Sequence, residues 1–490
     1  MSKFYLTSAI PYVNASPHIG HAQEFVYTDV IKRFQILKGK KVTYLCGADE
    51  NGLKIVQAAE KANQSPQLFC DIHQKEFLDL AQKLDVEFNI WQRGTDRDRH
   101  FLASQKLWQL CDQNGDIYKK SYTGLYCIGC ETFYTEDELD KKGECFEHPG
   151  KKLEKVSEEN YFFRLSKYQK FLKELVINDC LRIIPEIRKK EALSFINNGL
   201  KDFSVSRSKK RAKNWGVPVP NNPNQIIYVW FDALNIYQSG IGFGWNEKLY
   251  KIWSPQDVMV IGKGILRFHA IYWPAILKSA GLKLPKNLFI HGYLTVDGQK
   301  MSKTLGNVVD PIEMIKKYRG ADPLRYYLLR EIPSYSDGDF SERRFKELYN
   351  ADLANGLGNL VSRVAKLCET SKLDFSSIDL KIFKSIKSNR VLNEIEPLLE
   401  NFKFDNALER IWKSIKGLDA YIDRERPWEK TAREAKKRLE VMVKGSKAVV
   451  SLLEIGYALQ PFLPETSRKI LEQFSAPKIK FESPLFPRIK

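Results

Sequence analysis

Strand-like and helix-like segments alternate over the first 114 residues, and this alternation limits the fold more than any other feature. A short apolar run at residues 3–10 leads through a polar loop into a helical pattern over 18–38, which Gly39 ends, and a second apolar run follows at 41–48. Such repeats favour a parallel sheet with helices on its faces. The pattern continues with expected helices at 53–63, 66–84 and 96–114 and a strand at 86–92.

The alternation stops near Gly115 and resumes near residue 226. The intervening stretch consists of short turn-rich pieces with several cysteines, then a polar helical region and a basic run, which together indicate an inserted domain. Strands are expected again at 226–230, 258–261 and 288–296, with a helix over 265–280. From residue 356 the pattern is that of amphipathic helices, as in a helical bundle.

These patterns predict an α/β chain in five parts. A Rossmann-like parallel sheet is split by an insertion and followed by an all-α helical bundle. The expected boundaries are 1–114 for the first half of the sheet domain, 115–225 for the insertion, 226–328 for the second half, 329–355 for a linker and 356–490 for the bundle.

Size and charge narrow the class of protein. At roughly 150 residues per domain, 490 residues correspond to two to four domains. Lys and Arg number 78 against 60 Asp and Glu, so the net charge of +18 favours a polyanionic partner, with nucleic acid first and an anionic membrane surface second. The first residues show no signal-peptide pattern, and nowhere do about 18 apolar residues follow one another. We therefore expect a cytoplasmic protein with no membrane partner.

The most specific motif is His18-Ile19-Gly20-His21, where a strand and loop lead into a helix. A helix N-terminus offers unpaired N–H groups and a partial positive charge, both of which suit a phosphate. The two imidazoles share one face and can donate to phosphoryl oxygens, while Gly20 lets an adenine ring approach the backbone. The motif predicts an ATP site; the alternative is that the histidines only cap or pack the helix start.

A second motif, Lys300-Met301-Ser302-Lys303-Thr304, follows a predicted strand in a polar loop. Two lysines on such a loop can neutralise the charge on a leaving pyrophosphate. Alone, the loop reads as solvated surface. Together with the histidine motif, in this order and at the two ends of a split α/β domain, it resembles the signature of class I aminoacyl-tRNA synthetases.

Four further residues have the spacing of a zinc knuckle. Cys127 and Cys130 are followed, after fourteen intervening residues, by Cys145 and then His148. This Cys3His set predicts one structural Zn²⁺ per chain with no role in catalysis. The alternative is a set of unrelated thiols in a reduced loop, and the other five cysteines are interpreted as small packing residues.

The whole chain resembles the methionyl-tRNA synthetases of the bacterial or organellar type. The resemblance rests on Ser8 to Asn14, His18 to His21, Cys46 to Asp49 and the zinc knuckle, and continues through Val229 to Ala233, Phe268 to Ala275, Lys300 to Thr304, Asn359 to Arg363 and Arg426 to Trp428. It implies two reactions: methionine attacks Mg·ATP to give methionyl-adenylate, and the terminal adenosine of initiator or elongator tRNA(Met) then takes the methionyl group.

The resemblance also assigns site residues. His18, His21, Lys300 and Lys303 would be catalytic, and Gly20 and Met301 would complete the ATP site. Asp49 would bind the methionine ammonium. Without the resemblance, Trp230 and Tyr237 taken singly are better explained by ordinary core packing. The rest of the methionine pocket would be Ile10, Tyr12, Trp230, Ala233, Leu234, Tyr237, Ile265 and His269.

For tRNA, the resemblance places the anticodon on the C-terminal helices. Trp428, preceded by Pro427, would stack on a base, and Asn359 and Arg363 would contact base edges. In isolation, Pro427-Trp428 is better explained as a helix start with a buried indole. The run Lys209–Lys213 is a weaker candidate for contacts with tRNA phosphates, since charge runs commonly form a solvated face.

Three features depart from the family pattern, and other functions stay open. The stretch from Ser206 to Asn214 is longer and more basic than the family leads us to expect, so only Arg207 is carried over from it. Gly264 stands where the family often has Asp, which removes a polar contact expected near the substrate or ribose, while Thr304 keeps the hydroxyl of the common Ser. The alternatives are a synthetase for another small apolar or thiol amino acid, another nucleotidyltransferase, or a catalytically inactive tRNA-binding zinc protein. Because no further domain follows the bundle, a monomer is expected.

Overall fold

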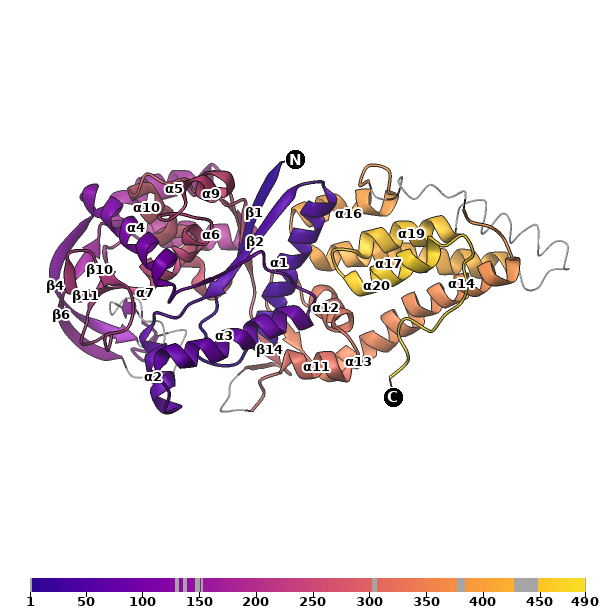
Figure 1. Ribbon diagram of the computed structural model, residues 1–490, viewed down its shortest axis with the longest axis horizontal. Coiled ribbons are helices and arrows are strands. Elements are labelled where there is room, and N and C mark those ends of the chain that lie inside the picture. Colours follow the sequence, from indigo (N-terminus) through magenta and orange to yellow (C-terminus); the bar gives the residue numbers. More distant parts are fainter. Residues whose placement is uncertain are drawn as a thin grey trace.

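The structure, a computed structural model, describes residues 2–127, 132–134, 139–145, 150, 153–301, 306–376, 383, 385–426 and 448–489; for 132 and 133 it describes the backbone alone. A body built around a β-sheet lies at one end of the long axis and a helical bundle at the other (Figure 1). Within the described residues, no helix is long and apolar enough to cross a membrane.

A six-stranded parallel sheet forms the centre of the first body. Its order is β3 (Ile90–Arg93), β2 (Lys41–Ala48), β1 (Lys3–Ser8), β12 (Val258–Gly262), β13 (Asn287–His291) and β7 (Arg182–Ile184). The chain moves outward from β1 to β3 on one side and from β12 to β13 on the other, so the strand order reverses between β1 and β12. Ligands of open α/β sheets bind at such a point, beyond the carboxyl ends of the strands.

Helices pack on both faces of the sheet and form a hydrophobic core with each face. The helices before the insertion are α1 (Ile19–Leu37), α2 (Leu53–Lys61), α3 (Pro66–Lys83) and α4 (Leu102–Gln113). Apolar residues of α1 and α3 pack with one face of the sheet, and those of α4 pack with the other. The strands are buried on both faces, which explains why they read as nearly continuous apolar runs.

The insertion has its own antiparallel sheet, of order β5 (Thr132–Tyr134), β4 (Ile117–Cys127), β6 (Glu154–Phe163) and β8 (Phe203–Ser204). Helices α5 (Gln169–Ile177) and α6 (Glu186–Asn197) flank β7, which pairs with β13 through Ile184 and Phe289. Residues 182–184 therefore lie within the stretch expected as the insertion, yet complete the edge of the large sheet.

The second half differs from the sequence prediction in three places. The apolar run at 226–230 is not a strand of the parallel sheet: β11 (Asn222–Ile227) pairs with β9 (Ser206–Ser208) and β10 (Pro218–Val219), and α7 (Val229–Ala233) and α8 (Ile236–Ser239) follow. The stretch expected as a helix at 265–280 is helical from 263 to 279, but the type of helix changes along it, from the 3₁₀ helix η4 (Lys263–Ile265) to the π-helix η5 (Phe268–Tyr272) and then α10 (Trp273–Ser279). The strand expected at 288–296 is two strands, β13 and β14 (Leu294–Val296).

The helical end contains α14 (Asn359–Ser371), α16 (Arg390–Glu400), α17 (Phe404–Glu425), α19 (Ala448–Leu459) and α20 (Pro464–Phe474), as expected from the amphipathic pattern. Helix α9 (Glu247–Trp253) belongs to the sheet-containing body, where it packs beside β1. The sheet is connected to the bundle by β15 (Gln299–Lys300), α11 (Pro311–Lys317), α12 (Ala321–Arg330), β16 (Gly338–Phe340), α13 (Glu342–Leu348) and η6 (Tyr349–Gly358).

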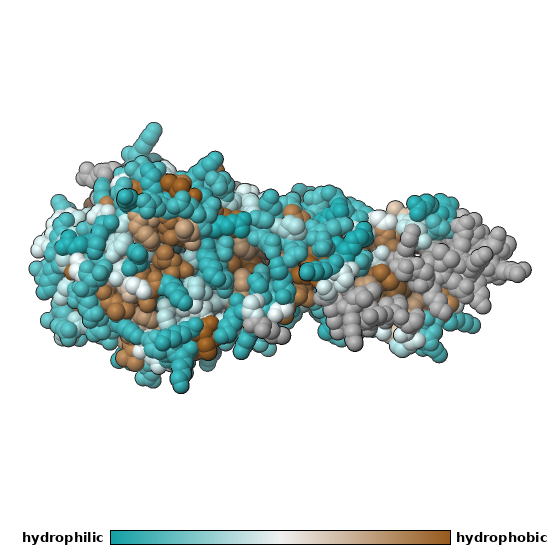
Figure 2. Space-filling view, turned by 90° about the horizontal axis from the view of Figure 1, so that it is seen from above, coloured by the Kyte–Doolittle hydropathy of each residue, from teal (hydrophilic) through white to brown (hydrophobic). Residues whose placement is uncertain are grey.

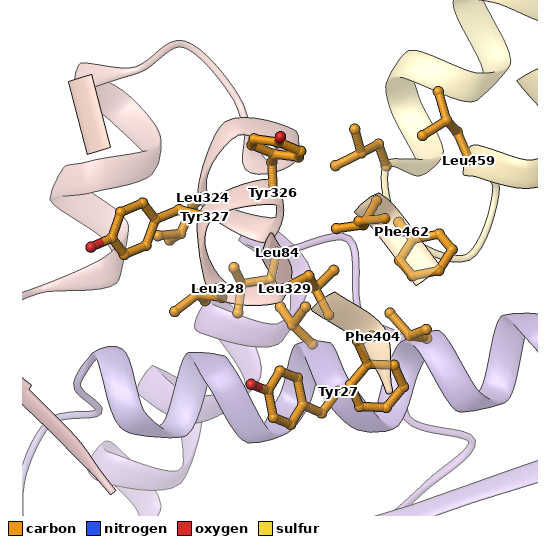
Figure 3. Packing of buried hydrophobic residues seen from close by; sticks show 14 of the residues in the cluster. Tyr27, Leu84, Leu324, Tyr326, Tyr327, Leu328, Leu329, Phe404, Leu459 and Phe462 are labelled. Carbon is orange, nitrogen blue, oxygen red and sulfur yellow. The ribbon is translucent and has the colours of Figure 1, made fainter. Parts of the chain in front are cut away.

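One continuous apolar core joins α1 to the bundle. Tyr27 of α1, Phe404 of α17 and Phe462 after α19 lie in the same cluster, beside the side chains of α12 (Figure 3). Within it, the fully buried Arg325 pairs with Asp29 of α1 at 2.8 Å and donates to the carbonyls of Phe462 and Pro461 at 2.7 and 2.9 Å. Because a buried guanidinium needs such partners, this bridge fixes α1 relative to the bundle.

Seen from above, most of the surface is hydrophilic. Apolar surface gathers in a hollow on the broad, sheet-containing end, with hydrophilic residues around it (Figure 2). A hollow with apolar walls and a polar rim is the usual form of a small-molecule site.

Candidate active site

A cavity of about 1290 Å³ opens where the strand order reverses. Its walls come from Ala9–Tyr12 after β1, from the first turn of α1, from Asp49 after β2 and from Gly262–His269 after β12. The carboxyl ends of three neighbouring strands thus deliver polar and aromatic side chains to one place, which parallel pairing of those strands requires.

The two motif histidines bond to the start of α1 itself. His18 is the N-cap residue and its Nδ1 accepts from the N–H of Gly20 at 3.1 Å, while His21 Nδ1 accepts from the N–H of His18 at 3.2 Å. The ring centroids lie 4.1 Å apart. The capping role considered from the sequence is therefore present. Capping is compatible with a phosphate site, because it uses only the Nδ1 atom of each ring as an acceptor.

This capping arrangement fixes the tautomer of both rings. A nitrogen that accepts from a backbone N–H carries no proton, so each neutral imidazole has its proton on Nε2, where it can donate to an anion. Burial, together with the nearby His18 ring, lowers the pKa of His21 well below its usual value. His21 is accordingly a neutral donor at physiological pH, and its Nε2 does not depend on charge to bind an oxygen.

Met301 of the lysine-containing motif lies over the same helix start. A Cβ added to Gly20 would lie 3.0 Å from His18 Cε1 and 3.8 Å from Met301 Cε, so the thioether of Met301 covers the glycine. After the loop, the chain is hydrogen-bonded to the start of α1, since the Ile19 N–H donates to the Val309 carbonyl at 3.1 Å. Lys300 is exposed at the end of β15, and Lys303 lies outside the described residues.

Aromatic rings build the wall of the cavity opposite α1. Trp230 stacks on Phe268 with centroids 3.8 Å apart and meets the edge of Tyr12 at 6.3 Å. All the residues expected to bind methionine line this one cavity: Ile10, Tyr12, Asp49, Trp230, Ala233, Leu234, Tyr237, Ile265 and His269.

A neutral polar pair closes one side of the aromatic wall. His269 Nδ1 bonds to the Ile265 carbonyl at 2.9 Å, and its Nε2 lies 3.0 Å from the Tyr237 hydroxyl. The carbonyl only accepts, so Nδ1 carries the proton and the Tyr237 hydroxyl donates to Nε2. Burial lowers the pKa of His269 to about 4 and raises that of Tyr237, which keeps both groups uncharged at neutral pH.

Asp49 places a carboxylate in the same cavity. It follows β2 directly, its N–H donates to the Pro11 carbonyl at 2.9 Å, and only 3% of its surface is exposed. An apolar slot with a buried carboxylate at one end can hold an α-amino acid whose side chain is unbranched and apolar.

Two further groups at the cavity were missed from the sequence. Glu24, one turn after His21, lines the cavity, and its carboxylate lies 2.9 Å from Nε2 of His291 at the end of β13. Lys263 lines the cavity next to Gly264, and its ammonium pairs with Asp337 at 2.6 Å. The spacing between His21 and Glu24 places both on one face of α1, and this spacing would have indicated Glu24 as a site residue. No sequence pattern indicates that His291 is its partner.

Asp232 occupies a buried polar network behind the aromatic wall. Its carboxylate accepts from Asn51 and from Ser104, both at 2.7 Å, and lies 2.9 Å from His100 Nε2. These side chains are all buried, and they connect α7, which carries Trp230, to α4 and to the loop after β2. The network holds the wall in place from outside the cavity.

Two of the four expected zinc ligands are described. Cys127 and Cys145 are buried in one small cluster with Tyr134, whose hydroxyl accepts from the Cys145 thiol at 3.4 Å. Cys130 and His148 lie outside the described residues, and no group of three or more potential ligands occurs among the residues that are described. Cys127 is the last residue of β4, and its place in one buried cluster with Cys145 fits the predicted knuckle.

The residues expected to read the anticodon are placed in part. Asn359 is exposed at the start of α14, one turn before Arg363. The Arg363 guanidinium forms ion pairs with Asp419 and with Asp423, the latter at 2.5 Å, both on α17. Pro427 and Trp428 lie outside the described residues.

Three basic residues of the insertion have partners. Arg207 lines the cavity, where it stacks on the Tyr228 ring at 4.3 Å and donates to Ser204 Oγ at 2.8 Å. Arg211 pairs with Glu154 at 2.9 Å and Lys213 with Glu60 at 2.6 Å.

Comparison with known proteins decides the family. Residues 4–365 match the model of the tRNA synthetases class I (M). The chain belongs to this family of class I tRNA synthetases. The methionine–tRNA ligase of Thermotoga maritima is 39% identical over 96% of this chain and 75% of its own length, and that of Brucella melitensis is 38% identical over 98% and 93%.

Solved structures of synthetases agree with the fold. The methionyl-tRNA synthetase of Mycobacterium tuberculosis in complex with methionyl-adenylate superimposes with a TM-score of 0.90 at 34% identity, covering all of both chains. The apo form of the same enzyme gives a TM-score of 0.82 at 31% identity, over 100% of this chain and 99% of that one. The parallel sheet with a helical bundle expected from the sequence is therefore confirmed.

Proposed function

We propose that this chain is a methionine–tRNA ligase that forms methionyl-adenylate from methionine and ATP and transfers the methionyl group to tRNA(Met). The observation that carries the proposal is a single cavity that combines the capped histidine motif, an aromatic apolar wall and a buried carboxylate. The ligase names of relatives that align over nearly the full chain support it.

In the activation step, the chain supplies position and charge, not a nucleophile. The methionine carboxylate attacks the α-phosphorus of Mg·ATP in line, and the bond to pyrophosphate breaks. His18 and His21 donate to the phosphates through Nε2, and Lys300 and Lys303 neutralise the leaving pyrophosphate from the loop beside Met301. Gly20 leaves room for the adenine, and Mg²⁺ arrives with the nucleotide.

The aromatic wall selects the amino acid. Trp230, Tyr12 and the uncharged pair of Tyr237 and His269 make favourable contacts with a thioether sulfur, which aromatic rings accept at their edges. Asp49 binds the ammonium group. A branched side chain would meet the stacked rings of Trp230 and Phe268, which favours methionine over isoleucine or valine.

The bundle reads the tRNA and the knuckle shapes the insertion. We assign anticodon contacts to Asn359, Arg363, Pro427 and Trp428, with Arg363 exchanging its carboxylate partners for a base edge on binding. One Zn²⁺ held by Cys127, Cys130, Cys145 and His148 would fix the hairpin of the insertion and take no part in the chemistry. We further propose a monomer that acts in the cytoplasm on initiator and elongator tRNA.

Charging of tRNA with radiolabelled methionine tests the function. The wild-type chain should form acid-precipitable methionyl-tRNA, and His21→Ala should slow adenylate formation by about 10²-fold or more, because it removes a donor aimed at charge that develops in the transition state. Binding of tRNA, measured by filter retention, should survive that change. Equal loss of activation and tRNA binding would mean that His21 has a structural role alone.

A further inference from the structure

A second, fully buried carboxylate follows Asp49 directly in the chain. Asp49 forms an isolated parallel bridge with Tyr12, so the chain is extended there, and consecutive residues of an extended segment project to opposite sides. Asp49 therefore faces the cavity that it lines, whereas Glu50 points into the protein and none of its surface is exposed. A buried carboxylate costs free energy unless it is paired and hydrogen-bonded, so its partners indicate its role.

The carboxylate of Glu50 bonds to the segment that ends the neighbouring strand. Strands β2 and β3 pair through Ala48 and Arg93, so the segments that follow them lie side by side. Arg93 donates from Nε to Oε1 of Glu50 at 2.9 Å, and its Nη2 lies 2.8 Å from the same oxygen. Thr95 donates to Oε2 from its backbone N–H at 2.9 Å and from its hydroxyl at 2.6 Å. Both oxygens of Glu50 therefore accept from this segment.

Further contacts join the same two segments. The Gly94 N–H donates to the Ala48 carbonyl at 3.0 Å, and Asn51 Nδ2 donates to the Gly94 carbonyl at 2.7 Å. A Cβ at Gly94 would lie 3.1 Å from the Ala48 oxygen and 3.2 Å from the Glu50 nitrogen, so the segments are in close contact. Trp215, from the insertion, donates from Nε1 to the Glu50 carbonyl at 2.6 Å. These contacts fix the backbone just before and just after the carboxylate that lines the cavity.

Binding of an ammonium group depends on where the Asp49 carboxylate is held. A binding group has to stay within about 0.5 Å of its productive position, and a group on a loop needs more support for this than one on a strand. Asp49 lies in the connection between β2 and α2. A shift of this connection would part Glu50 from Arg93 and leave a carboxylate buried without its cation, which is strongly unfavourable. The Glu50 bonds therefore oppose any displacement of Asp49.

We propose that Glu50 is a positioning residue for the amino acid: its bonds to Arg93 and Thr95 hold the connection after β2 so that the Asp49 carboxylate meets the methionine ammonium. The inference rests on the proposed ligase function and on the assignment of the ammonium to Asp49. It adds that the affinity for the ammonium depends on a residue that does not line the cavity. The effect is on methionine binding, and ATP binding at the start of α1 is independent of it.

Glu50→Gln tests the assignment without a change of size. Both Glu50 oxygens accept from N–H groups, so a carboxamide places its NH2 against at least one N–H donor whichever way it is turned. In methionine-dependent ATP–pyrophosphate exchange, the KM for methionine should rise about tenfold or more, with kcat and the KM for ATP within about threefold of wild type. Asp71→Asn is the matched control, because Asp71 lies 2.6 Å from Arg93 Nη1 on the exposed side, and it should leave all three values unchanged.

Two inhibitors separate an effect on the ammonium from a general loosening of the pocket. Methioninol has the ammonium but no carboxylate, and 4-(methylthio)butanoate has the side chain and carboxylate but no ammonium. Glu50→Gln should weaken competitive inhibition of exchange by methioninol about tenfold or more and leave inhibition by 4-(methylthio)butanoate within about twofold of wild type. Equal weakening of both inhibitors would show that Glu50 only stabilises the fold, and would overturn the proposal.

A double-mutant cycle measures whether Glu50 acts through Asp49. Asp49→Asn removes the charge that binds the ammonium, so adding Glu50→Gln to it should change the KM for methionine by less than about twofold. A further rise as large as that caused by Glu50→Gln in wild type would contradict the proposal. Absence of methionine-dependent exchange in the wild-type chain would instead refute the ligase function, so the two failures are distinguishable.

A smaller change keeps the test available if Glu50→Gln does not fold. Thr95→Val removes the hydroxyl that donates to Glu50 Oε2 and keeps the shape of the side chain, so it should raise the KM for methionine about threefold or more. Thr95→Ser keeps the hydroxyl and should retain the wild-type KM. Equal KM values for Thr95→Val and Thr95→Ser would overturn the proposal.

Discussion

Replacing His269 by Gln tests whether the polar pair in the cavity is uncharged, as its geometry requires. Burial lowers the pKa of His269 from 6.5 to about 4. Between these two pH values the ring is protonated in the unfolded chain and neutral in the folded chain. Stability from this group is therefore fully present above the unfolded pKa and is lost as the pH falls from about 6.5 toward 4. Linkage gives a loss of about 2 kcal/mol between pH 7 and pH 5.

Urea unfolding of wild type and His269→Gln at both pH values measures this loss. The variant cannot titrate at this position, so its free energy of unfolding should fall by about 2 kcal/mol less than that of wild type. His73→Gln is the control for replacing a histidine elsewhere, because His73 lies on α3 against Glu76 and does not line the cavity; in this variant the Tyr237–His269 pair is intact and the loss due to His269 should remain. An identical loss in wild type and His269→Gln would refute the reasoning.

Direct titration of the ring gives an independent check. The chain has seven histidines, few enough for their ring protons to be followed by NMR, and the resonance missing from His269→Gln identifies His269. That resonance should stay in its neutral position down to about pH 5. A midpoint near 6.5 would show that the Tyr237–His269 pair takes up a charge in the range where the enzyme works.

Three further changes probe other parts of the site. Gly20→Ala places a Cβ 3.0 Å from the His18 ring, so it should displace that ring and cut ATP–pyrophosphate exchange by about 10–100-fold, with tRNA binding unchanged in a filter assay. Trp428→Ala should raise the KM for tRNA about tenfold by loss of base stacking and spare exchange; an unchanged KM would remove Trp428 from the tRNA site. Cys145→Ala should lose bound zinc by plasma mass spectrometry, whereas Cys180→Ala, at an exposed thiol, should keep it; full metal in the first variant would contradict the ligand set.

The sequence predicted those features whose local pattern also determines their place in the fold. The helix that begins at the histidine motif could be predicted because the motif caps it, and the residues of the amino-acid pocket could be grouped because the family resemblance covers the whole chain. Their common cavity follows from parallel strands ending side by side.

The failures have physical reasons. The apolar run at 226–230 has no periodicity that separates a buried strand from a buried helix, and the structure divides it between β11 and α7. Strand β7 has three residues and gains its place from pairing with β13, which no local pattern records. The pairing of Glu24 with His291 joins positions far apart in sequence, and the carboxylates that bind Arg363 lie on another helix. Such contacts are set by packing alone.

The central claim is that this one cavity activates methionine. ATP–pyrophosphate exchange, measured with each of the twenty amino acids in turn and without tRNA, tests it most directly. Exchange with methionine, and with no other amino acid at comparable rate, is the predicted result. Exchange with isoleucine, valine, leucine or cysteine in its place would reassign the pocket, and exchange with none would contradict the account and make Gly264, where the family often has a carboxylate, the first position to restore.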